Sequence, residues 1–124
     1  MEKYTTLSPL ALAFVGDAVH TKFVREHVVL NMDNSKLNNY HNLAKKFCNA
    51  SHQRAVLEKL LPLLSEEEKD VVRRARNAKA KHKAKNYDEE DYKKATAFEA
   101  LVGYLYLSKQ EERLKEILNI SVQD

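Results

Sequence analysis

The sequence contains very little glycine, proline or cysteine. Its 124 residues include two glycines, two prolines and one cysteine, Cys48. So few glycines and prolines allow few tight turns, which favours helices. A single cysteine excludes an internal disulfide, so we expect a reducing compartment and a cytoplasmic protein. No apolar run is long enough to cross a bilayer and residues 1–6 are polar, so neither a membrane segment nor a signal peptide is expected.

The remaining composition is typical of one folded domain. Hydrophobic residues make up 44% of the chain, which excludes general disorder. A length of 124 residues predicts a single domain over residues 1–124. The formal net charge is only +3, so the distribution of charge is more informative than its total.

Helix-start signals and apolar residues at helical spacing predict an all-α fold of six or seven helices. The pair Ser8–Pro9 should begin the first helix, with serine as N-cap and proline at the first helical position. Ser65 and Asp88 each precede an acid-rich first turn, which the helix macrodipole favours. Ser51 is expected to cap a helix that Pro62 ends.

Two apolar helical runs each contain one acid and one of the two glycines. The first run contains Gly16 and Asp17, and the second, near the other end of the chain, contains Glu99 and Gly103. Glycine inside a helix costs about 1 kcal/mol relative to alanine, so its presence needs a physical reason. Close approach of two helices is such a reason. We therefore expect these helices to cross and to bring Asp17 and Glu99 to a shared site.

Two interpretations of this acid pair remain open. An ionised carboxylate in apolar surroundings is costly unless a cation or hydrogen bonds meet it. Asp17 and Glu99 could be structural acids, each paired with its own arginine or lysine. Alternatively they bind Mg²⁺, which prefers oxygen ligands, retains several waters and is often held by one or two carboxylates plus a substrate phosphate. A metal in such a site supports phosphodiester hydrolysis. The second interpretation predicts that the carboxyl groups lie within about 5 Å of each other.

The histidines do not suggest a metal centre. No spacing among them resembles a zinc site. His20, His41, His52 and His82 are therefore expected at the surface or in helix caps.

A basic stretch, residues 73–85, contains three arginines and four lysines but no acid. Its cations are Arg73, Arg74, Arg76, Lys79, Lys81, Lys83 and Lys85. This stretch could be only a solvated surface. It could also bind nucleic-acid phosphates, which would make affinity strongly dependent on salt. Few aromatic residues interleave with the lysines, which favours backbone contacts to a duplex over stacking on single-stranded bases.

Two motifs carry a resemblance to a known family. Residues 14–19, Phe-Val-Gly-Asp-Ala-Val, resemble the ribonuclease III catalytic-domain signature, whose aspartate binds metal. Residues 98–107 resemble that family's second motif, whose glutamate binds the same metal. The family usually has further acids where this chain has Ala13 and Thr96, and at this length we expect no double-stranded-RNA-binding domain after the catalytic domain. These departures resemble the short branch called Mini-ribonuclease III, as do residues 10–17, 76–79 and 111–114.

The resemblance implies an all-helical homodimer that cuts double-stranded RNA with Mg²⁺. It implies catalytic and metal-binding roles for Asp17 and Glu99, with one metal held partly through water. It also implies maturation of precursor 23S (large-subunit) ribosomal RNA in bacteria. One alternative, favoured by Ala13 and Thr96, is a catalytically inactive RNA-binding or ribosome-assembly module. A helical DNA-binding domain is a third, weaker possibility.

Overall fold

Helices account for the whole regular structure of the described chain. The computed structural model describes residues 7–31, 37–78 and 88–123, and these ranges contain six α-helices, one short 3₁₀ helix and no strand. The elements are α2 (Pro9–Asn31), α3 (Leu37–Cys48), α4 (Ala50–Leu60), η1 (Leu61–Leu63), α5 (Glu66–Arg76), α6 (Glu89–Leu107) and α7 (Glu111–Ser121). None of these helices combines the length and apolarity that crossing a membrane requires. The all-α prediction is confirmed.

Most helices begin where the sequence predicts, because the N-cap side chains accept hydrogen bonds from the first turn. Ser8 Oγ accepts from the backbone N–H of Leu10 at 3.2 Å. Ser65 forms a full capping box with Glu68, in which each side chain meets the other's backbone N–H. Asp88 caps α6 by accepting from two backbone N–H groups of its first turn.

The predicted cap of α4 is wrong by two residues. Asn49 is the N-cap, and its Oδ1 accepts from the backbone N–H of His52 at 2.8 Å. Ser51 lies inside the first turn. Asn49 also donates to the backbone carbonyl of Lys45 in α3 at 2.9 Å, so one side chain joins the end of α3 to the start of α4.

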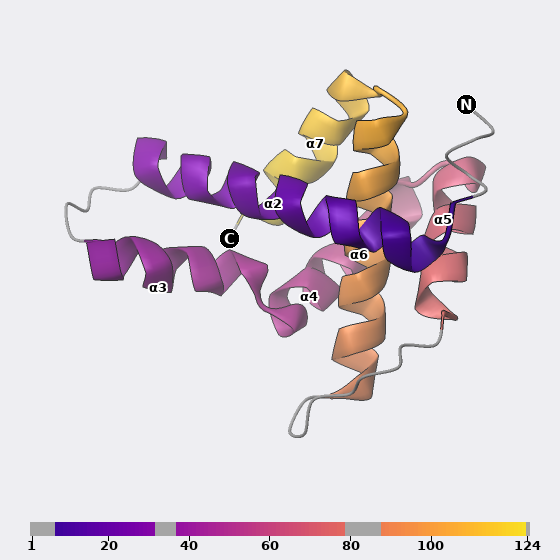
Figure 1. The fold of residues 1–124 in the computed structure, drawn as a ribbon, viewed down its shortest axis with the longest axis horizontal. Coiled ribbons are helices and arrows are strands. Elements are labelled where there is room, and N and C mark those ends of the chain that lie inside the picture. The colour runs from indigo at the N-terminus through magenta and orange to yellow at the C-terminus, as the bar shows by residue number, and fades with distance from the viewer. Residues whose placement is uncertain (1–6, 32–36, 79–87, 124) are drawn as a thin grey trace.

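Helix α6 lies at the centre of the fold (Figure 1). Helix α2 crosses it, α4 and α5 pack against it, and α7 follows it after a sharp turn in which Lys109 has φ 60°. Helix α3 runs back along α2 (Figure 1). From Ala95 to Leu105 every residue of α6 except Glu99 is buried. A helix packed on all sides needs apolar residues all round, which explains the composition of this run.

Helices α2 and α6 cross at the two glycines, Gly16 and Gly103. A Cβ on Gly16 would lie 1.7 Å from the backbone oxygen of Glu99, and a Cβ on Gly103 would lie 1.9 Å from the backbone oxygen of Leu12. Real atoms cannot approach so closely, so each position requires glycine while the helices keep this separation. The predicted crossing of two glycine-bearing helices is confirmed.

Candidate active site

The crossing of α2 and α6 determines the positions of Asp17 and Glu99. Asp17 directly follows Gly16, and Glu99 is the residue whose backbone oxygen faces Gly16. Asp17 is exposed, whereas Glu99 is half-buried. The expected apolar surroundings are therefore wrong for Asp17, because α2 turns this residue to solvent and buries Leu12, Ala13 and Gly16 instead.

The two carboxyl groups interact. The pKa of Glu99 is raised to about 8 by burial first, then by the negative charge of Asp17 and a hydrogen bond with it. A hydrogen bond from the Gln53 side chain acts in the opposite direction. No described lysine or arginine is among the groups that shift the pKa of Glu99. The interpretation of Glu99 as a structural acid neutralised by its own arginine thus finds no support in the described chain.

This pair fits a hard divalent cation. A cation between the carboxylates would remove the repulsion that favours a protonated Glu99, and Mg²⁺ needs only one or two protein carboxylates because it keeps several waters. Within the described ranges no cluster of three or more His, Cys, Asp or Glu residues could hold a metal. Ala13 is buried, and Thr96 Oγ1 donates to the backbone oxygen of Tyr92 at 2.8 Å, so neither adds a carboxylate.

Comparison with known proteins identifies the family. The sequence matches the Ribonuclease III domain over residues 10–110, a range that includes both acids and both glycines.

The chain belongs to the ribonuclease III family, in its Mini-ribonuclease III branch. It is 49% identical to the Mini-ribonuclease 3 of Symbiobacterium thermophilum over 91% of this chain and 86% of that protein. It is 46% identical to the Mini-ribonuclease 3 of Staphylococcus aureus over 91% of this chain and 85% of that protein. A crystal structure of a Fusobacterium nucleatum protein matches with a TM-score of 0.83 at 33% identity, covering 94% of this chain and 93% of that one. This membership makes the chain an endoribonuclease of the ribonuclease III type.

A chain of buried polar side chains lies behind Glu99, and the sequence did not reveal it. His20, predicted at the surface or in a cap, is 1% exposed, because it sits on the face of α2 turned toward α4 and α7. His20 Nδ1 lies 3.2 Å from Gln53 Nε2, and His20 Nε2 lies 3.2 Å from Ser121 Oγ. Burial lowers the pKa of His20 to about 4, so its ring is neutral at neutral pH.

The arginines of the basic stretch all make contacts within the molecule. Arg73 pairs with Asp70 on α5, and Arg76 pairs with Glu90 across to α6 at 3.5 Å. Arg74 donates to the backbone oxygen of Leu7 at 3.3 Å. The predicted contacts of Lys79, Lys81, Lys83 and Lys85 fall outside the described residues.

The sequence analysis did not identify Lys22 and Arg25, two cationic residues beside Asp17. Lys22 and Arg25 line a concavity of about 520 Å³ together with Asp17 and Thr21. The spacing from Asp17 to Thr21 and Arg25 is four and eight residues, which places all three on one helix face. This helical spacing is the sequence signal that could have identified Arg25. Lys22 also pairs with Glu26 at 2.8 Å.

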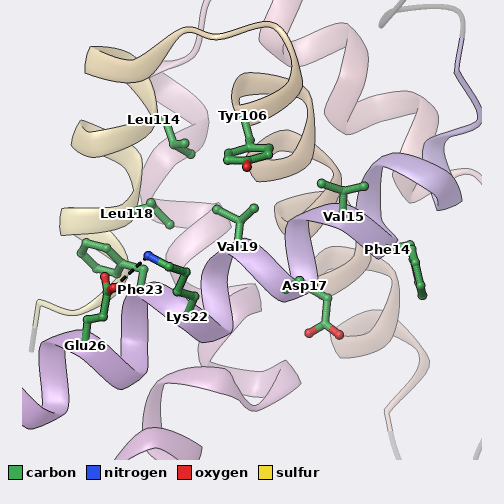
Figure 2. Close-up of a pocket in the computed structure, with 11 residues that line it drawn as sticks. Phe14, Val15, Asp17, Val19, Lys22, Phe23, Glu26, Tyr106, Leu114 and Leu118 are labelled. Atoms are coloured by element: carbon green, nitrogen blue, oxygen red, sulfur yellow. Dashed lines mark hydrogen bonds and ion pairs between the residues drawn. The ribbon is translucent and has the colours of Figure 1, made fainter.

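An apolar groove of about 650 Å³ flanks the same part of α2. Figure 2 shows Val15 and Val19 of α2 facing Tyr106 of α6 and Leu118 of α7, while the Asp17 carboxylate points away from Tyr106. Phe14, at one end of this groove, is 83% exposed, and Tyr106 is 53% exposed. Large apolar side chains gathered around a groove are typical of a surface that another protein covers.

Proposed function

We propose that the protein is a Mg²⁺-dependent endoribonuclease that cleaves double-stranded RNA, with Asp17 and Glu99 as metal ligands and catalytic residues. This proposal rests mainly on the crossing of α2 and α6 at two glycines. The crossing brings the backbone of Glu99 into contact with Gly16, the residue directly before Asp17. The raised pKa of Glu99, caused by burial and by Asp17, supports it because no described lysine or arginine is among the groups that shift this pKa.

The chain's own groups have distinct tasks in this reaction. Asp17 is exposed and Glu99 is half-buried, so Asp17 would bind the metal at the solvent side and Glu99 would bind it as the second carboxylate ligand. A bound Mg²⁺ supplies water activation and stabilisation of the leaving oxygen. Asp17 and Glu99 would together hold that ion beside the bond to be cleaved.

Cationic side chains hold the RNA backbone. Lys22 and Arg25 lie in the concavity that contains Asp17, so they are placed to neutralise phosphates beside the cleaved bond. The basic stretch extends this contact through Arg73, Arg74, Arg76, Lys79, Lys81, Lys83 and Lys85. Contacts of this kind read the shape of a duplex rather than its sequence.

The functional unit is a homodimer built on the apolar groove. The two strands of a duplex run in opposite directions, and a twofold dimer presents two identical sites with matching polarity. The groove is lined by apolar side chains of α2, α6 and α7, of which Phe14 and Tyr106 are exposed, and a second copy would cover them. Each protomer would then cut one strand.

The natural substrate that we propose is precursor 23S (large-subunit) ribosomal RNA, processed in the bacterial cytoplasm. This assignment rests on membership of the Mini-ribonuclease III branch. It is tested by asking whether bacteria that lack the protein accumulate precursors with unprocessed, base-paired ends.

Substitution of Asp17 by asparagine tests the mechanism. Asp17→Asn removes one charge from the metal site but keeps the size of the side chain, and Asp17 is exposed, so the fold should be retained. We expect cleavage of duplex RNA to be abolished while duplex binding stays within a few-fold of the unsubstituted protein. Cleavage is measured on a labelled duplex with and without Mg²⁺. Continued cleavage by this variant would refute the assignment.

A further inference from the structure

We propose that Arg25 is the main phosphate-binding residue of the concavity beside Asp17, and that Glu26 keeps Lys22 away from the RNA by pairing with it. This inference rests on the proposed function and deepens it, because it assigns unequal tasks to the two cations that line this concavity.

The position of Arg25 on α2 suits a contact with a phosphate next to the cleaved bond. Arg25 follows Asp17 by eight residues, which places both on one face of the helix. A rise of 1.5 Å per residue separates their Cα atoms by about 12 Å along the helix axis. Ala18 and Thr21, which also line the concavity, have small side chains. A phosphate backbone that reaches Asp17 can therefore continue along α2 to Arg25, which would bind a phosphate other than the one that is cut.

The guanidinium group of Arg25 is available for such a contact. Arg25 is exposed, and no carboxylate of the residues that the structure describes forms an ion pair with it. A planar guanidinium group can donate two parallel hydrogen bonds to the oxygens of one phosphate. Arg25 can thus bind RNA without losing a partner in the protein.

Lys22, the other cation of the concavity, already has a partner. Its Nζ lies 2.8 Å from Oε2 of Glu26, and Figure 2 shows the Lys22 side chain turned toward this carboxylate. Lys22 and Glu26 also line the apolar groove, whereas Arg25 does not. A phosphate that approached Lys22 would be repelled by Glu26 and would have to displace it. The ion pair therefore lowers the share of Lys22 in RNA binding.

The salt dependence of duplex binding separates the two cations. Each phosphate that the protein neutralises adds roughly one to the slope of log affinity against log salt concentration. We therefore expect Arg25→Gln to weaken binding several-fold and to lower this slope by about one. Lys22→Gln is the matched control, because it removes the same charge from the same concavity, and its slope should equal that of the unsubstituted protein. Fluorescence anisotropy of a labelled duplex in a chelating buffer measures both.

Glu26→Gln tests whether the ion pair restrains Lys22. This change frees Lys22 and removes a negative charge from the concavity, so duplex binding should tighten and the slope should increase by about one. In Lys22→Gln/Glu26→Gln no cation is freed, so the slope should stay at that of the unsubstituted protein. All these side chains are exposed, so each variant should fold. A slope that Glu26→Gln leaves unchanged would show that Glu26 does not hold Lys22 back.

Cleavage kinetics with Mg²⁺ tests which phosphate Arg25 binds. Arg25→Gln should raise KM and leave kcat nearly unchanged, as loss of uniform binding does. A fall in kcat at unchanged KM would place Arg25 at the reacting phosphate, and equal losses of slope in Arg25→Gln and Lys22→Gln would make the two cations equivalent; either result overturns the inference. If the unsubstituted protein binds the duplex with the expected slopes but does not cut it, the catalytic assignment is wrong and the phosphate contact stands.

Discussion

At the scale of single residues, Glu99 is the group whose chemistry depends most on its surroundings. Its folded pKa of about 8 lies above the ordinary value of 4.5 because burial and Asp17 oppose ionisation. Between these two pH values the folded state holds a proton that the unfolded chain has lost. Stability from this source is therefore greatest below pH 4.5 and falls as pH rises through 8.

Glu99→Gln removes this dependence, because an amide does not titrate. In metal-free buffer at pH 9 we expect the variant to be more stable than the unsubstituted protein, and at pH 5 the two should differ little. Urea unfolding with a chelator present measures both. Mg²⁺ should reverse the order at pH 9, since only the unsubstituted protein gains binding energy. A variant that is less stable at pH 9 without metal would contradict the assigned pKa.

The same proton should compete with the proposed metal. Binding a cation requires an ionised Glu99, so each Mg²⁺ bound below about pH 8 displaces a proton. Apparent Mg²⁺ affinity should therefore rise with pH up to about 8 and then level off. Calorimetry in two buffers of different ionisation enthalpy measures the released proton directly. Equal heats in both buffers at pH 7 would show that no proton leaves.

The arrangement of the candidate site was predictable only in part. Asp17 and Glu99 could be paired because each shares an apolar run with one of only two glycines. The buried contacts of His20 with Gln53 and Ser121 could not be predicted, since none of these partners lies at helical spacing from it. Gln53 lies 33 residues from His20, and Ser121 lies 101 residues from it, so only tertiary packing brings them together.

At the scale of helices, the glycine crossing sets the position of both acids. Gly16→Ala places a Cβ 1.7 Å from the backbone oxygen of Glu99, so α2 and α6 must separate. Helix propensity alone would make this change stabilising by about 1 kcal/mol. We expect instead a loss of about 3 kcal/mol or more, as in overpacked cores, together with loss of Mg²⁺ binding.

Urea unfolding measures this loss, and Ala55→Gly provides the propensity control. Ala55 is exposed on α4, so its replacement reports the cost of glycine in a helix without any change in packing. Ala55→Gly should cost about 1 kcal/mol and leave Mg²⁺ binding unchanged. If Gly16→Ala is as stable as the unsubstituted protein, the crossing tolerates a Cβ and the helices are farther apart than described.

Helix boundaries illustrate which local signals can be trusted. Ser65 was identified correctly because its capping box with Glu68 is a two-residue pattern that no neighbour matches. The cap of α4 was misplaced because Asn49 and Ser51 are both good caps two residues apart. Asn49 is the N-cap because its side-chain amide also donates to the backbone oxygen of Lys45, a contact that exists only once α3 is formed.

At the scale of the whole molecule, the apolar groove predicts how two copies assemble. Phe14 is 83% exposed, so Phe14→Asp should not weaken the protomer, yet it should place a charge in the proposed interface. We expect a shift from dimer to monomer in sedimentation equilibrium and, because one site then acts alone, nicking of one strand in place of cleavage of both. Leu63→Asp is the matched control, since Leu63 is 57% exposed on η1 and does not line the groove. A Phe14→Asp protein that remains dimeric would move the interface to another face, and a monomeric unsubstituted protein would remove it.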